Sequence, residues 1–425
     1  MTTSEMFKEL FRNLAIDNAA TISTKYGEIT RSLNQNFRYT ESKTNNTLQV
    51  GSYGRWTGIK GISDLDMLYI MPNSQWDTYK NDQSKLLTDT KDAIKARYPK
   101  TEVKVDRLVV QVIYTNFMVE VQPVFRRRDG GFYYPDTYKG GSWKVTKPQE
   151  EIDEVKNFVD NKTSNFRHLC KMARTWKNKH GVGMGGLLID TLAYNFLNST
   201  TDYDDKSFTD YDWMCRDFFK YLADEPNKNH YAALGSRQQV KVRSKFQRKA
   251  KKAYDLCLKA IDAGEADSAN KKWKKVFGRP FPAVESVQER KSADAFRQPE
   301  QFIEDLYPID IRFNVKIECE VLQNGFRESL LRTMLARKIK LSASKKLKFY
   351  VESINVPDGF IIKWKVLNRG AEAERRNCIR GDIVIDKGFR KKEEKTDFIG
   401  EHIVECYVIK NGVVVAKDRI DVPIQ

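Results

Sequence analysis

Two short segments in which apolar and acidic residues alternate place the strongest constraint on the fold. They read SDLDMLYIMP and MVEVQPVF. If each forms a β-strand, side chains two positions apart point to the same face, so Asp64 and Asp66 share a face and Leu65 opposes them. In the second segment Glu120 opposes Val119. If the two strands are neighbours, their apolar residues share the core face and all three acids share the open face.

Three carboxylates on one face predict a metal site. Such groups repel one another unless a cation lies among them. Oxygen-only ligands suit Mg²⁺ or Mn²⁺, and two such ions can activate a hydroxyl and stabilise a leaving pyrophosphate. In a chain with 57 acidic residues the alternative is a solvated strand end. Gly51 and Ser52 favour the metal site, because a glycine turn lets backbone N–H groups and a hydroxyl approach a triphosphate closely.

The periodicity of the chain changes along its length. Apolar residues recur every three or four positions from residue 4 to about 39, which predicts helix, and strand-like runs beginning with LQVGSYG follow. From about 148 to 278 the pattern is mainly helical, with helices expected over 161–179, 187–197 and 237–263.

The last part of the chain is predicted to be mostly β. FIIKWKVL alternates in the manner of a strand, and Asn411-Gly412 is a hairpin turn signal. A proline-rich GRPFP and a polar stretch precede this part and are typical of a linker. We therefore expect a catalytic core with its N-terminal helix over 1–150, a helical substrate-binding lobe over 151–285, a linker over 286–300 and a β-rich domain over 301–425.

The motifs taken together resemble a known family. GSYGRWT from Gly51, SDLD from Ser63 and VEVQPVF from Val119 resemble the polymerase-β nucleotidyltransferase fold. More narrowly they are similar to bacterial cGAS/DncV-like nucleotidyltransferases (CD-NTases), over about residues 1–285, and ITRSLNQNF and WKKVFGRPFP agree. The C-terminal WKVLNRG and GEHIVEC resemble the adenylyl/guanylyl and SMODS C-terminal sensor domain. The expected fold class is an α/β (α+β) polymerase-β-like core with a helical lobe, plus a C-terminal mostly-β domain.

The resemblance implies a reaction. Relatives are Mg²⁺-dependent synthases that join ATP, GTP or both through 3′-5′ or 2′-5′ bonds, release pyrophosphate and close a cyclic di- or trinucleotide. The product then acts on a separate effector in anti-phage signalling. Two alternatives stay open: a nucleotidyltransferase acting on RNA or protein, and a catalytically silent nucleotide or RNA sensor. The silent sensor ranks last, because all three acids are present.

The resemblance also implies roles for single residues. Asp64, Asp66 and Glu120 match the metal-binding acids, and Glu120 would help to deprotonate the attacking hydroxyl. Gly51 and Ser52 match contacts to the donor phosphates.

Other predicted substrate-binding positions match less closely. Arg55 and Thr57 belong to the same glycine-serine motif. Relatives often carry a phosphate-contacting lysine in a KxW-like helix, where this chain has Arg174, with Lys171 one turn earlier. Either cation can contact phosphates, and the alternative is that both lie on a solvated helix face.

A second departure follows shortly after. Where relatives carry a polar motif, this chain reads GMGGL, and the amides of Gly185 and Gly186 can replace hydroxyl groups at a helix N-terminus.

The net charge of +17 predicts acidic partners such as phosphates or nucleic acid. Eight basic residues between Arg237 and Lys252 form either a nucleic-acid track or, as we favour, a solvated helix face. Nucleic acid is thus an allowed partner that the predicted reaction does not require.

Other classes of protein are not expected. The N-terminus lacks a signal-peptide pattern, and no apolar run is long enough to cross a membrane. Six widely separated cysteines and four histidines do not predict a zinc site, and a structural role is expected for His168 and His180. We therefore expect a cytoplasmic protein with reduced, mostly buried thiols.

Overall fold

A computed structural model describes residues 1–424, except 62, 116, 265–266, 284–299, 340, 369–370, 377–379 and 398. The chain forms two compact units. The first contains Met1–Thr175, Gly186–Val242 and Ala250–Pro282, and the second contains Trp176–Gly185, Arg243–Lys249 and Ala283–Gln425. Apart from Glu300, the predicted linker over 286–300 lies outside the described residues.

A seven-stranded sheet organises the first unit. Its main order is β1-β2-β5-β4-β3, and β6 and β7 continue from β5. The pairing of β2 with β5 is parallel, and the other pairings are antiparallel. The strands are β1 (Thr47–Gln49), β2 (Asp64–Ile70), β3 (Glu102–Asp106), β4 (Val109–Ile113), β5 (Met118–Arg126), β6 (Phe132–Asp136) and β7 (Ser142–Thr146).

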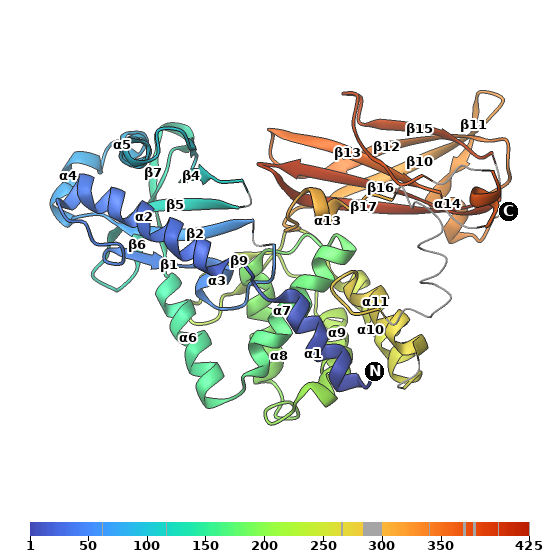
Figure 1. The fold of residues 1–425 in the computed structure, drawn as a ribbon, viewed down its shortest axis with the longest axis horizontal. Helices are drawn as coiled ribbons and strands as arrows, with labels where there is room; N and C mark the ends of the chain where they lie inside the picture. Colours follow the sequence, from blue (N-terminus) through green and yellow to red (C-terminus); the bar gives the residue numbers. More distant parts are fainter. Residues whose placement is uncertain are drawn as a thin grey trace. The chain divides into compact units, whose positions relative to one another are not determined.

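Two helices, α2 (Ala19–Arg38) and α5 (Gln83–Arg97), lie against this sheet (Figure 1). Leu33 of α2 and Leu87 of α5 are fully buried in one cluster with Met67 of β2 and Val121 of β5. The alternation predicted for β2 and β5 is therefore confirmed, since apolar residues of both strands face the helices. Each buried side chain of this size contributes about 1.5–3 kcal/mol relative to an exposed one.

The N-terminal region differs in detail from the expected helix over 4–39. It contains two helices, α1 (Thr3–Leu14) and α2, and Ala15 between them is extended. The prediction of strand for LQVGSYG was also partly wrong. Only its start belongs to β1, and Gly51–Gly54 forms the short helix α3, because Gly51 turns the backbone with φ +66°.

Helices dominate the chain from 148 to 277, as expected. They are α6 (Pro148–Asn161), α7 (Asn165–His180), α8 (Gly186–Asn198), α9 (Tyr211–Asp224), α10 (Gln247–Ile261) and α11 (Asp267–Phe277).

The helix predicted over 237–263 begins ten residues late, at Gln247. Before it, β8 (His230–Ala232) pairs with β9 (Gln239–Lys241) as a hairpin. Arg237 has φ +56°, which an α-helix does not accept. The basic residues between 237 and 252 therefore do not share one helix face, although the apolar stripe from Phe246 to Ala260 is buried as predicted.

The C-terminal part of the second unit is mostly β, as predicted. Two antiparallel sheets have the orders β11-β10-β12-β15 and β14-β13-β16-β17. Their bounds are β10 (Val315–Gln323), β11 (Phe326–Leu330), β12 (Lys346–Ile354), β13 (Phe360–Leu367), β14 (Ile383–Ile385), β15 (Lys391–Lys395), β16 (Gly400–Lys410) and β17 (Val413–Ile424), and the short helices are α13 (Ile303–Leu306), α14 (Leu331–Ala336) and α15 (Ala371–Arg375).

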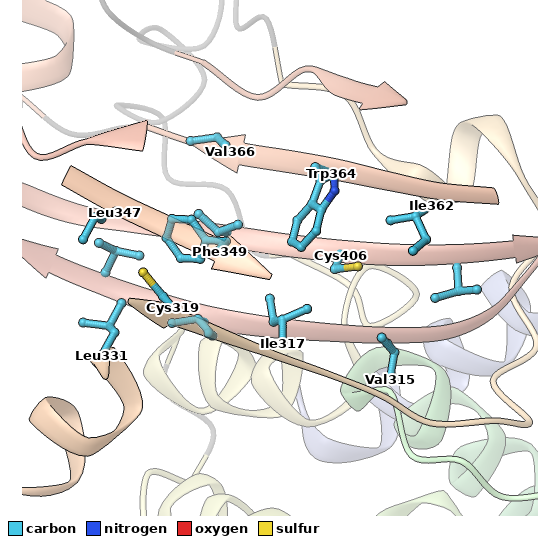
Figure 2. Close-up of a cluster of buried hydrophobic side chains, with 14 of the residues drawn as sticks. Val315, Ile317, Cys319, Leu331, Leu347, Phe349, Ile362, Trp364, Val366 and Cys406 are labelled. Carbon is cyan, nitrogen blue, oxygen red and sulfur yellow. The ribbon is translucent and has the colours of Figure 1, made fainter. Parts of the chain in front are cut away.

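A single apolar core joins the two sheets. Figure 2 shows Ile362, Trp364 and Val366 of β13 in this core together with Phe349 of β12 and Ile317 of β10. The alternation of FIIKWKVL is confirmed.

The hairpin at Asn411-Gly412 is confirmed too. Both residues have positive φ, 50° and 75°, between the paired ends of β16 and β17.

Two segments from the middle of the chain belong to the second unit. Lys177, near the end of α7, is 1% exposed and forms an ion pair with Asp310. Its ammonium group also donates to the carbonyl oxygens of Met184 (3.1 Å) and Ile311 (3.0 Å). Three acceptors satisfy all three N–H groups of this buried cation, which fixes residues 310–311 to the segment 176–185 of the same unit.

Five of the cysteines are buried and free, as predicted, and burial raises their pKa values. Cys378 lies outside the described residues. None of the helices in the described parts of the chain is both long and apolar enough to cross a membrane.

His168 packs as a structural residue in the first unit. Its Nδ1 lies 2.6 Å from the Tyr211 hydroxyl, and its ring contacts those of Phe11 and Phe208. Burial, with a smaller effect from Lys171, lowers the pKa of His168 from 6.5 to about 4.

This depressed pKa predicts an acid-sensitive stability. Between pH 6.5 and 4 the unfolded chain binds a proton at residue 168 that the folded protein does not bind. Stability should therefore be present above pH 6.5 and fall by up to about 3 kcal/mol as the pH drops to 4. Urea unfolding of the wild type and His168→Asn at several pH values measures this. The variant should lose part of the slope in this window, and identical slopes would contradict the assignment.

Candidate active site

The three predicted acids come together on the sheet of the first unit. Asp66 lies directly beside Glu120 in the parallel pairing of β2 with β5, and Asp64 lies beside Met118. One carboxylate oxygen from each acid lies within 4.8 Å of the others. Leu65 and Val119 point to the opposite, buried face. Three convergent oxygen ligands fit a divalent cation such as Mg²⁺ or Mn²⁺.

Neighbouring groups hold the carboxylates in place. Gln111 of β4 lies opposite Glu120 and donates from Nε2 to its Oε1 at 3.2 Å. The Ser63 hydroxyl donates to Asp64. Both bonds restrict the rotation of an acidic side chain, as hydrogen bonds to metal ligands commonly do.

Gly51 lies so close to Asp66 that a side chain at this position would displace the carboxylate. A Cβ built on Gly51 would lie 1.8 Å from Oδ2 of Asp66, and the φ of +66° is one that side chains disfavour. The turn is closed by the Ser52 carbonyl, which accepts from the N–H groups of Thr57 (2.9 Å) and Gly58 (3.0 Å). The glycine-serine motif is therefore held directly beside Asp66.

A buried carboxylate, Asp190 of α8, collects three residues that we expected to bind substrate. Its Oδ2 accepts from Nε of Arg55 (2.9 Å) and from the Thr57 hydroxyl (3.0 Å). Both of its oxygens accept from Arg174, at 2.5 and 3.0 Å. Arg55 and Arg174 are only 4% and 5% exposed. The structure therefore brings all three side chains to Asp190, and neither arginine lies on a solvated helix face.

The charges in this network are balanced. Glu151 of α6 accepts from Arg55 at 3.2 Å and from Ser236 at 3.1 Å. Burial would raise the pKa of Asp190, but the charges of Arg174 and Arg55 outweigh it and lower the pKa to about 2. The network ties the segment after α3 to α6, α7 and α8.

Sequence reasoning missed Asp190. A signal was present, since Asp190 is the only acidic or basic residue in the helix GLLIDTLAYNFLN. An acid in such an apolar helix requires a buried cation. The sequence does not say which cation, because Arg55 and Arg174 lie 135 and 16 residues away.

The remaining predicted positions are Lys171, Gly185 and Gly186. Lys171 lines a cavity of about 1010 Å³ together with Tyr26, Lys43 and Tyr53, and no acid of the triad borders that cavity. Gly186 begins α8 as predicted, and its carbonyl accepts from Arg174 at 3.2 Å. A Cβ on Gly185 would meet no atom within 4 Å, so that backbone is open to a ligand.

Two family models match separate parts of the chain. Residues 1–158 match the Second Messenger Oligonucleotide or Dinucleotide Synthetase domain, and residues 297–425 match the Adenylyl/Guanylyl and SMODS C-terminal sensor domain. The first match contains the three acids and the glycine-serine motif, and the second covers both C-terminal sheets.

Individual proteins resemble the chain more weakly. A cyclic AMP-AMP-AMP synthase of Acinetobacter sp. is 21% identical over 318 residues, which cover 69% of this chain and 90% of that protein. A probable cyclic nucleotide synthase of Bacillus cereus is 19% identical over 55% of this chain and 82% of its own length. CdnC of Escherichia coli MS115-1, in a complex with HORMA-deltaN, shares the fold with a TM-score of 0.50 and 16% identity, over 66% of this chain and 98% of its own.

The close approach of Gly51 to Asp66 predicts a sensitive position. Gly51→Ala should displace the Asp66 carboxylate and weaken Mn²⁺ binding at least about tenfold, since one ligand of three is moved. Electron paramagnetic resonance of free Mn²⁺ measures the affinity. Gly61→Ala is the matched control, because Gly61 also has positive φ (+79°) but its Cβ would meet no atom within 4 Å. Equal losses in both variants would assign the effect to backbone strain alone.

The Asp190 network predicts a large effect on stability. Asp190→Asn leaves two buried guanidinium groups with one carboxylate and should cost about 3–5 kcal/mol. Chemical denaturation measures this, with Asp205→Asn as an exposed control that should change little. A variant as stable as the wild type would show that the network is not required for folding.

Proposed function

Since the chain belongs to the bacterial cGAS/DncV-like nucleotidyltransferases and carries their C-terminal sensor domain, we propose that it joins ATP, GTP or both into a cyclic di- or trinucleotide. The convergence of Asp64, Asp66 and Glu120 within 4.8 Å carries the proposal. The product would act on a separate effector in anti-phage signalling. Both sequence relatives are named as cyclic nucleotide synthases, which supports this substrate class.

The chemistry follows from the positions of the acids. In each step a ribose hydroxyl attacks the α-phosphorus of a donor triphosphate, and Glu120 would help to take up the proton that the hydroxyl loses. A new P–O bond forms, the bond to the β-phosphate breaks, and pyrophosphate leaves. Bound Mg²⁺ would lower the pKa of the hydroxyl and stabilise charge on the leaving group. Asp64, Asp66 and Glu120 would hold the metal, and the hydrogen bond from Gln111 restricts the rotation of the Glu120 side chain.

We divide the other site residues by what they touch. Gly51 and Ser52 lie beside Asp66 and would contact the donor phosphates through backbone N–H groups and the hydroxyl. Arg55, Thr57 and Arg174 would act as positioning residues, because their polar atoms hold Asp190. For Lys171, Gly185 and Gly186, substrate contact stays a prediction.

The proposal predicts a metal-dependent synthesis that needs the acids. Full-length protein incubated with labelled ATP and GTP and Mg²⁺ should yield a phosphatase-resistant product, and EDTA should abolish it. Asp64→Ala/Asp66→Ala should lower the rate at least about a thousandfold, since several kcal/mol of transition-state stabilisation is lost.

The matched control for this assay is Asp160→Asn, which removes an exposed carboxylate of α6 and should keep the wild-type rate. Mass spectrometry of the product and digestion by a 3′-5′-specific nuclease would identify the bases and the linkage. Linear extension of added RNA without a cyclic product would instead identify an RNA nucleotidyltransferase and reject the proposal.

A further inference from the structure

Three consecutive arginines lie at the end of β5 and in the turn that follows it toward β6. The backbone of this turn is fixed, because Arg127 N–H donates to the Gly131 carbonyl at 2.9 Å and Gly131 N–H donates to the Asp129 carboxylate at 3.1 Å. Arg127 also forms an ion pair with Asp129 at 3.0 Å. Arg126 and Arg128 are exposed, and neither forms an ion pair with any described residue. The turn therefore presents two uncompensated guanidinium groups on a rigid support.

Aromatic rings lie next to these charges. Trp76 of α4 (Trp76–Tyr79) stacks on Tyr133 of β6, with ring centroids 5.6 Å apart and planes inclined by 30°. The guanidinium group of Arg127 lies 4.6 Å from the centre of the Tyr133 ring. The Trp76 ring, the Tyr133 ring and the Arg127 guanidinium group therefore lie next to one another, and the last of them belongs to the charged turn.

The turn and the rings border a groove of about 560 Å³. Its lining includes Asn73, Trp76, Tyr133 and the three arginines, and Asp129 is the one acid among the described residues that line it. Pockets for small organic ligands commonly have volumes of about 300–1000 Å³. The groove is therefore large enough for a nucleotide and carries an excess of positive charge.

The groove is separate from the candidate active site. Glu120 lies near the start of β5 and Arg126 is its last residue. Six residues of extended strand span about 20 Å. None of the three metal-binding acids lines the groove.

We propose that this groove binds a nucleoside phosphate as a second ligand site. Arg126 and Arg128 bind the phosphate, because guanidinium groups donate paired hydrogen bonds to phosphate oxygens. The base stacks on the guanidinium plane of Arg127, which itself lies over the Tyr133 ring, as bases do on arginine side chains. The same chemistry is offered by a free nucleotide and by a nucleotide within a single strand. The site does not depend on the synthesis proposed above.

Titration calorimetry on the full-length protein in EDTA tests the proposal without any catalytic readout. Adenosine monophosphate should bind the wild type at least about tenfold more tightly than ribose 5-phosphate, which lacks the base, and adenosine, which lacks the phosphate. Equal binding of ribose 5-phosphate would overturn the stacking role, and no binding of adenosine monophosphate would overturn the site.

Charge reversal locates the binding. Arg126→Glu/Arg128→Glu should weaken binding of adenosine monophosphate at least about tenfold, and the milder Arg126→Gln/Arg128→Gln should weaken it less. The control, Lys100→Glu/Lys156→Glu, makes the same change in net charge at exposed positions outside the groove and should bind as the wild type does. If the groove variants bind like the wild type, the nucleotide binds elsewhere and the proposal fails.

A last experiment distinguishes a free nucleotide from a nucleotide within a single strand as the ligand. A short oligoadenylate that binds the wild type more tightly than the mononucleotide, and loses this advantage in the groove variant, supports a single strand. Equal affinities, both lost in the variant, support a free nucleotide. Tight binding of the oligoadenylate that survives the charge reversal contradicts the groove as its site.

Discussion

Parallel pairing of β2 with β5 places Asp66 directly beside Glu120, and with Asp64 it brings three carboxylates within 4.8 Å. This concentration of negative charge is unfavourable without a cation. The same two strands bury Met67 and Val121 against α2 and α5 on the other face. The burial of apolar side chains on one face of these strands therefore holds the three carboxylates close together on the other face. A shift of one residue in the register of either strand would exchange its two faces. Both the apolar packing and the cluster of carboxylates would then be lost.

Two positively charged residues, Arg55 and Arg174, have a structural role that could not be predicted from the sequence. Arg55 and Arg174 look like phosphate ligands when read along the chain, yet both are buried around Asp190. Their charges outweigh the effect of burial, which by itself raises the pKa of this carboxylate. The glycine-serine motif is thereby connected to three helices, through ion-pair partners of Arg55 that lie 96 and 135 residues away from it in the sequence.

The features that sequence reasoning recovered are those set by local periodicity. Alternation predicted β2, β5 and β13 and the shared face of the acids, and Asn411-Gly412 predicted its hairpin. Local pattern failed where distant pairing decided the outcome. The stretch after Arg237 has helical composition, but its pairing with β8 and the left-handed backbone at Arg237 prevent a helix.

The partners of Asp190 and the use of residues 176–185 by the second unit escaped prediction for the same reason. Each depends on tertiary neighbours far away in the sequence. The resemblance to a known family named three acids that the structure brings together, but it also named Arg55, Thr57 and Arg174, whose polar atoms hold Asp190.

The burial of Lys177 against Asp310 and Ile311 has a consequence for how such proteins can diversify. The β-rich part does not fold around contiguous gene sequence alone, because its unit also contains 176–185 and 243–249. Recombination at the segment after Pro282 would therefore exchange the strands of this unit. Lys177 and the rest of the segment 176–185 would stay with the original chain. Successful exchange of C-terminal domains in evolution requires the incoming domain to supply an acid and a carbonyl group, as Asp310 and Ile311 do here, to a cation that it does not encode.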